Sequence, residues 1–236
     1  MKTFFGKLAN AIATYRDDYA NASTSEELAK VFHDGEEIRD KMVAALEEKI
    51  PVAEVENMPD IFWIENVLPG YVVELVAEGT QYYLFKDFKQ LHTKARQTKG
   101  EEDDIFTDLG LSIYERDSIE YFYPAWFLQT WDYGGHSLLG SGKHNDVLAL
   151  ADEVMSMSDY FKNDIAVFKN DLLRDISNPQ ITYWNASDKI VAEIDDILAA
   201  DYEILSSDDV ISLKARKGQF KDFEKNGIEL NVRTGE

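Results

Sequence analysis

The feature that most constrains the fold of this chain is an apolar stripe at helical spacing in its second half. Side chains at steps of three, four or seven residues share one face of an α-helix. The stripe consists of Val147, Ala151, Val154, Phe161, Ile165, Phe168 and Leu172, with Ser158 at the one position of the pattern that is not apolar. We therefore predict a long central helix over residues 145–176. Flanking apolar residues such as Leu148 and Met155 widen the stripe, which favours packing against several helices over a two-stranded coiled coil.

Other segments show the same periodicity together with signals for helix starts. Thr24 followed by Glu27 matches a capping box, and it predicts a helix that runs to Pro51 with a bend or a short break at Asp34-Gly35. Asn145, Ser187 and either Ser206 or Ser207 are the expected caps of later helices. The predicted fold class is mostly α, a multi-helix, bundle-like globular domain.

One segment departs from the helical pattern. Residues 71–85, YVVELVAEGTQYYLF, contain two runs rich in Val and Tyr on either side of a short segment that includes Gly79. This arrangement favours a small β-hairpin. The alternative is a helix through Gly79, in which the glycine costs about 1 kcal/mol relative to alanine.

The chain length sets the expected domain organisation. At 236 residues the chain can bury one substantial core, and we predict a single compact helical domain over residues 1–236. A sub-division near residues 99–104 is the alternative, and residues 214–236 form a basic tail. The acidic run at residues 101–104 is read as a helix start, because it lacks the spacing and the turn glycine of a calcium loop.

Composition excludes several classes of site. The chain has no cysteine, so disulfides, thiolate metal sites and a cysteine nucleophile are ruled out. It also has no apolar run of about 18 residues, and its first residues carry a helical stripe through Phe4, Leu8 and Ile12. We therefore expect a soluble, cytoplasmic protein without a membrane segment or a bound cofactor.

The charge is strongly one-sided. The sequence holds 24 Lys and Arg against 45 Asp and Glu, a formal net charge of −21, and residues 101–200 alone carry 20 acids and 6 bases. Such a surface repels nucleic acid and anionic lipid and attracts a basic protein. The plainer interpretation is that acidity only maintains solubility. The oligomeric state is left open.

Residues 121–146, YFYPAWFLQTWDYGGHSLLGSGKHND, concentrate aromatics, glycines and histidines as no other stretch does. We interpret the aromatic half, residues 121–133, as a buried core helix, and the glycine-rich half as a loop that leads into the long helix. Gly135 and Gly140 have the spacing of a phosphate loop, but Ser141 stands where lysine is required. Ser137 or Ser141 near a histidine and an aspartate could suggest a nucleophile system, but the GxSxG pattern is absent. The candidate ligand or partner residues are Trp131, Asp132, Tyr133, Gly134, Gly135, His136, Lys143, His144 and Asp146.

Two functional hypotheses follow from these observations. The first is a non-catalytic, acidic helical protein-interaction module, such as an inhibitor, an immunity-like protein or an adaptor, that binds a basic partner. The alternative is a small-molecule-binding protein or a hydrolase-like enzyme with a pocket around residues 126–146. The His and Asp spacings there are not diagnostic of a metal site or of catalysis, so no metal ligand or catalytic residue is assigned.

Overall fold

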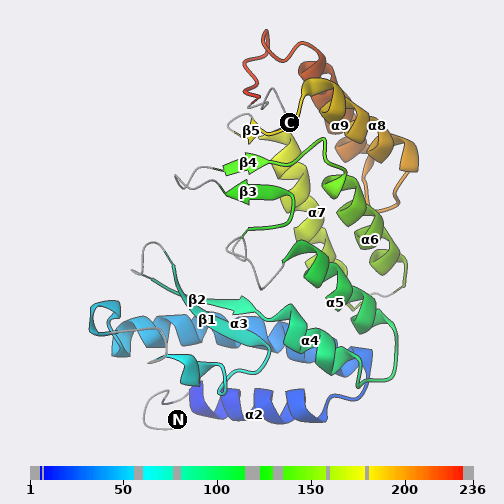
Figure 1. Cartoon of the computed structure of the whole chain (residues 1–236). Helices are drawn as coiled ribbons and strands as arrows, with labels where there is room; N and C mark the ends of the chain where they lie inside the picture. Colours follow the sequence, from blue (N-terminus) through cyan, green and yellow to red (C-terminus); the bar gives the residue numbers. More distant parts are fainter. Residues whose placement is uncertain are drawn as a thin grey trace. The chain divides into compact units, whose positions relative to one another are not determined.

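The computed structural model describes residues 6, 8–55, 61–76, 81–114, 123–129, 135–157, 160–178 and 181–230. Within these residues the chain is mostly helical and contains two small β-sheets (Figure 1), which confirms the predicted fold class. Contacts between residues divide the chain into two compact units, Met1–Thr107 and Asp108–Glu236. The single-domain organisation stays a prediction.

The first unit packs helices against a two-stranded ribbon. Figure 1 shows α3 between α2 and the ribbon, and buried side chains from all of these elements form one apolar core. Buried core residues include Ile12, Met42, Leu46, Val73 and Leu84. The elements are α2 (Leu8–Asn21), α3 (Ser25–Lys49), η1 (Val52–Glu54), η3 (Phe62–Ile64), β1 (Tyr71–Val76), β2 (Gln81–Lys86) and α4 (Phe88–Ala95).

The predicted hairpin is confirmed. Strands β1 and β2 pair antiparallel in a register that joins Tyr71 to Lys86 and Val76 to Gln81. Burial alternates along β2, where Tyr82 and Leu84 are buried while Tyr83 is exposed. The β-branched and aromatic residues therefore place one face of the ribbon on the core.

Helix α3 begins at the predicted cap and is not broken in its middle. The Thr24 hydroxyl accepts a hydrogen bond from the Glu27 amide, and the helix then runs without interruption from Ser25 to Lys49. A break at Asp34-Gly35, one of the two predicted possibilities, is therefore wrong. A methyl group at Gly35 would lie 2.9 Å from the Tyr71 hydroxyl and 3.0 Å from the Tyr15 ring, so this glycine permits close packing of α3.

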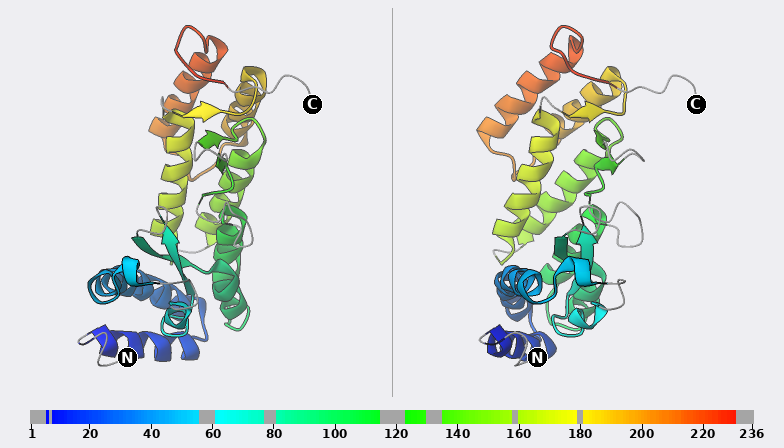
Figure 2. Two further views of the ribbon diagram at one scale, coloured as in Figure 1. Left: turned by 60° about the vertical axis from the view of Figure 1, so that its left-hand side comes forward. Right: turned by 90° about the vertical axis from the view of Figure 1, so that its left-hand side faces the viewer.

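The second unit is built around four helices. They are α6 (Lys143–Met157), α7 (Lys162–Ser177), α8 (Ser187–Ala200) and α9 (Ser207–Lys221). Helix α6 contacts α7 and α8, and α9 contacts the same two helices. Each of the four helices therefore packs against two of the others (Figure 2). Helix α5 (Glu102–Ile113) begins in the first unit and ends in the second.

The prediction of one continuous helix over residues 145–176 is wrong. This segment forms two helices, α6 and α7, that pack against each other. The apolar stripe continues on both sides of the connection because each helix buries its own face, with Val147 and Val154 on α6 and Ile165 and Leu172 on α7. A regular stripe reports which face is buried, and a helical hairpin satisfies it as well as a single straight helix does.

Two of the three expected caps of later helices are also wrong. Helix α6 starts at Lys143, before Asn145, and Ser187 is the first residue of α8 and donates its hydroxyl hydrogen to the Phe220 carbonyl at 2.6 Å. Only Ser206 caps its helix, through a reciprocal capping box with Asp209.

A three-stranded sheet lies beside these helices in the order β3 (Phe127–Gln129), β4 (Gly135–Ser137), β5 (Thr182–Tyr183). Strands β3 and β4 are antiparallel, whereas β4 and β5 are parallel. The expected core helix in the aromatic segment is therefore wrong at residues 127–129, although Trp126 is buried as expected. The three residues of β3 itself are half-buried.

The described part of the basic tail, residues 214–230, contacts acidic and carbonyl groups of its own unit. Lys217 pairs with Asp195 at 2.5 Å, and the buried Arg216 donates to the Ile176 carbonyl at the end of α7. Leu230 forms an isolated bridge with Tyr183. These contacts tie α9 to α7 and α8, and the residues after α9 to β5.

Candidate functional site

A buried polar cluster joins β4, α6 and α7 in the second unit. Asp175 Oδ2 accepts a hydrogen bond from Ser137 Oγ at 2.5 Å and lies 2.8 Å from His144 Nε2. Ser137 and His144 are completely buried, and Asp175 is 6% exposed. A buried carboxylate requires such partners, because an unpaired charge in the protein interior is costly.

Glu193 on α8 supplies the cap at the start of α6. Its Oε1 accepts from the backbone amides of His144 at 2.9 Å and Asn145 at 3.1 Å, and its Oε2 accepts from the Gly140 amide. The first amides of a helix have no partner within the helix, and the helix dipole favours a negative charge there. A carboxylate that is 4% exposed is therefore stabilised by three backbone donors.

The Ser137, His144 and Asp175 side chains do not form a nucleophile system. In a catalytic triad the base bonds the serine through one ring nitrogen and the carboxylate through the other. Here both hydrogen bonds end at the same Asp175 oxygen, and Ser137 Oγ also accepts from the Leu139 amide at 3.1 Å. His144 Nδ1 has no hydrogen-bond partner among the described residues, and its nearest acid, Glu193 Oε1, is 3.9 Å away. The cluster therefore holds β4, α6 and α7 together.

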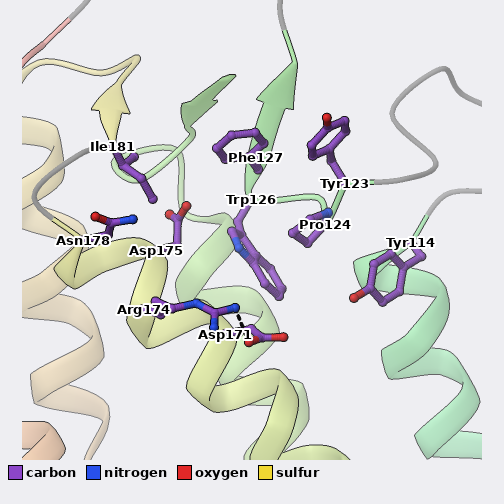
Figure 3. Close-up of a pocket in the computed structure, with 10 residues that line it drawn as sticks. All are labelled: Tyr114, Tyr123, Pro124, Trp126, Phe127, Asp171, Arg174, Asp175, Asn178 and Ile181. Carbon is purple, nitrogen blue, oxygen red and sulfur yellow. Dashed lines mark hydrogen bonds and ion pairs between the residues drawn. The ribbon is translucent and has the colours of Figure 1, made fainter. Parts of the chain in front are cut away.

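A pocket of about 280 Å³ opens beside this cluster. Figure 3 shows the Trp126 indole in the middle of the lining residues, with the ion pair of Arg174 and Asp171 below it. The ion pair measures 2.7 Å, and Asp175 reaches the pocket wall from α7. The pocket is lined by Tyr114, Tyr123, Pro124, Trp126, Phe127, Asp171, Arg174, Asp175, Asn178 and Ile181.

An acidic surface surrounds Tyr202, in the connection between α8 and α9. Burial, followed by the charges of Asp152, Asp146 and Asp196, raises the pKa of the Tyr202 hydroxyl above its usual value. Three acids from α6 and α8 thus lie close enough to act on one side chain. Together with the adjacent exposed acids Asp201 and Glu203, these residues are called the Tyr202 surface below.

The acids of the Tyr202 surface differ from their neighbours in lacking a cation. In the described part of the chain, neither Lys nor Arg pairs with Asp146, Asp196, Asp201 or Glu203, whereas Asp195 pairs with Lys217. Asp152 is engaged by the Ile204 amide at 2.7 Å, which fixes the loop after α8. The surface therefore combines an ordered backbone with negative charges that no described basic side chain neutralises.

The candidate residues predicted from the sequence fall into separate environments. Trp131, Asp132, Tyr133 and Gly134 lie outside the described residues. Gly135 and His136 lie on β4, and Lys143, His144 and Asp146 lie in the first turn of α6. His136 contacts the Trp184 ring at 5.0 Å, whereas His144 contacts Asp175, so the two imidazoles have different partners.

The described residues contain no group of three or more His, Asp or Glu side chains that could hold a metal ion. Nor does any helix in the described ranges have the length and apolar character that a membrane span requires.

Sequence reasoning missed the residues that organise this region, chiefly Asp175 and Glu193. Both carried a signal, because each is an acid on the apolar face of an amphipathic helix. Asp175 follows Leu172 by three residues, and Glu193 follows Ile190 by three and precedes Ile197 by four. A charge at such a position predicts a buried partner, although the sequence does not say which one.

Comparison with known proteins gives no assignment. No protein-family model matches the chain, and no significant match is found among curated proteins or solved structures.

Proposed function

We propose that this chain is a non-catalytic, acidic helical protein-interaction module whose partner is a basic protein. The observation that carries the proposal is the Tyr202 surface, where the carboxylates of Asp146, Asp196, Asp201 and Glu203 have no described cationic partner. Keeping like charges together without neutralising them destabilises a fold, and a complementary positive surface relieves that cost.

The charge of the whole chain supports the same class of partner. A net charge of −21 accelerates encounter with a positively charged protein and disfavours nucleic acid and anionic membranes. Tyr202 adds a feature typical of binding surfaces, because a tyrosine ring offers apolar area at low entropic cost. Its hydroxyl donates to Asn145 Oδ1 at 2.9 Å, which fixes the position of the ring on the surface.

The burial of Ser137 and His144 favours this function over a hydrolase-like enzyme. A nucleophile and its base must reach substrate, but both side chains are fully buried and engaged with Asp175. We further propose that the protein is cytoplasmic, which fractionation of cells that express the tagged chain would test.

The experiment compares two double charge reversals that change the net charge equally. In Asp196→Lys/Glu203→Lys the Tyr202 surface is reversed, whereas in the control Asp17→Lys/Glu47→Lys two exposed acids of the first unit are reversed. Each protein is immobilised and exposed to native lysate at low and high salt. A retained basic protein is then purified and its dissociation constant is measured by calorimetry as a function of salt.

We expect a basic protein to bind the wild type and the control variant, with an affinity that falls steeply as salt rises. Reversal at the Tyr202 surface should weaken that binding at least about tenfold, equivalent to about 1.4 kcal/mol. Equal binding by the two variants would show that only the total charge matters. Salt-insensitive binding, or retention of no basic protein, would contradict the proposal.

A further inference from the structure

We propose that the pocket beside Trp126 is a binding site for a cationic group, a guanidinium or an ammonium, carried either by a small molecule or by a basic side chain. The site lies on α7 and β3 and does not include the acids of the Tyr202 surface. Binding there is independent of whether the Tyr202 surface binds a partner.

Four aromatic side chains are among the described residues that line the pocket. Tyr123 and Phe127 stack with their ring centroids 5.4 Å apart at an interplanar angle of 27°, and Trp126 and Tyr114 also line the pocket. The face of an aromatic ring carries negative electrostatic potential and attracts cations, worth about 0.5–2 kcal/mol per contact. An aromatic wall of this kind is suited to a flat guanidinium or to a substituted ammonium.

A buried carboxylate gives the pocket its charge preference. Asp175 is 94% buried, its Oδ2 is taken by Ser137 and His144, and its Oδ1 has no hydrogen bond from any described residue. Because Asp175 also lines the pocket, this oxygen is an acceptor that a ligand can use. A cationic donor is the partner that a desolvated carboxylate oxygen favours most.

The remaining charges lower the attraction for an anion. Among the described lining residues Arg174 is the one base, and its guanidinium is paired with Asp171 at 2.7 Å. Two acids and one base give these described residues a net charge of −1. An anion at Arg174 would have to approach both carboxylates, whereas a cation can replace Arg174, whose side chain is 73% exposed and free to turn towards solvent.

The volume limits the size of the ligand. About 280 Å³ is close to the lower end of the range of roughly 300–1,000 Å³ that is typical of ligand pockets. The space therefore fits one cationic group with a short alkyl chain.

The test uses blocked amino acids as probes, with binding measured by calorimetry on the full chain. The probes are Nα-acetyl-arginine methylamide, the corresponding lysine compound, and the citrulline compound, which has the shape of arginine without its charge. We expect saturable binding of the arginine or lysine probe, with a dissociation constant of about 1 mM, and no binding of the citrulline probe. A short peptide with one arginine between neutral residues distinguishes the two possible carriers of the cationic group. If the peptide binds more tightly than Nα-acetyl-arginine methylamide, the group belongs to a basic side chain of a partner; if the two bind equally, it belongs to a small molecule.

Two variants distinguish a cation site from an anion site. Arg174→Gln removes the competing cation and should tighten binding of the arginine probe about threefold, whereas Asp171→Asn should weaken it about threefold. Asp171 and Arg174 are both partly exposed, so neither change is expected to unfold the chain, and circular dichroism checks this. Asp196→Lys/Glu203→Lys should leave probe binding unchanged, which separates failure at this pocket from failure at the Tyr202 surface.

Three results would overturn the proposal. They are the absence of saturable binding by either cationic probe, equal binding of the citrulline and arginine probes, and loss of binding in Arg174→Gln, which would make the arginine itself the recognition group.

Discussion

The cap that Glu193 provides at the start of α6 gives the sharpest test of how the second unit is held together. In Glu193→Gln the amide oxygen can take the place of Oε1 and keep the bonds from His144 and Asn145, which measure 2.9 and 3.1 Å. The amide nitrogen then faces the Gly140 amide, so one hydrogen bond is lost and a donor is left unpaired. The exchange also removes a negative charge from the amino terminus of a helix.

The expected loss of stability follows from these two changes. An unpaired buried donor costs about 1–3 kcal/mol, and loss of the favourable charge–dipole interaction costs about 0.3–1 kcal/mol. We expect Glu193→Gln to lower the free energy of unfolding by about 2–3 kcal/mol. Glu193→Ala removes all three bonds and should cost about 4–5 kcal/mol, at the upper end for single substitutions.

Urea unfolding followed by circular dichroism measures the change, and hydrogen exchange assigns it. The amides of Gly140, His144 and Asn145 should lose protection more than amides of the first unit do. Glu153→Gln is the control, because the side chain of this exposed glutamate makes no hydrogen bond or ion pair among the described residues, so the variant should stay within about 0.5 kcal/mol of wild type. If Glu193→Gln unfolds at the wild-type urea concentration with unchanged exchange at these three amides, the cap does not stabilise α6.

Two further predictions concern packing and acid stability. Gly35→Ala should destabilise the first unit by about 1–3 kcal/mol in thermal or urea unfolding, because the new methyl group would lie 2.9 Å from the Tyr71 hydroxyl. The control is Gly218→Ala, whose new methyl group would have no atom within 4 Å and which should be neutral or stabilise the protein by up to about 1 kcal/mol. Equal effects at both sites would refute the packing explanation. Although partial burial raises it, the hydrogen bond from Lys169 holds the pKa of Asp209 below its ordinary value of 3.8, so the stabilisation is present above about pH 4 and is lost as the pH falls through the folded-state pKa. The difference in unfolding free energy between wild type and Asp209→Asn should therefore shrink from pH 5 to pH 3, and a constant difference would refute the assignment.

Local signals in the sequence predicted local structure well. Thr24 and Ser206 cap their helices, and the Val- and Tyr-rich runs around Gly79 pair as a hairpin. These features depend on residues a few positions apart, so their physical cause is contained in a short stretch of chain.

Predictions failed where distant residues replaced local ones. The sequence predicts Asn145 as the cap of the helix that follows it, but Glu193 on α8 supplies the acceptor instead. It predicts a bend or a break at Gly35, but α3 continues through this residue, and the ring of Tyr15 and the hydroxyl of Tyr71 require its lack of a side chain. In both cases a local preference of about 1 kcal/mol was outweighed by tertiary contacts.

The candidate site shows the same division. The sequence alone determined the helical class and the strongly acidic charge, because these follow from composition and periodicity; the region around residues 126–146 stays a prediction of where a site lies. Only the tertiary structure brought Asp175 to Ser137 and His144, and grouped Asp146 with Asp152 and Asp196 around Tyr202. The physical reason is that amphipathic periodicity tells which face of a helix is buried, but the partner of a buried acid is chosen by how the helices pack.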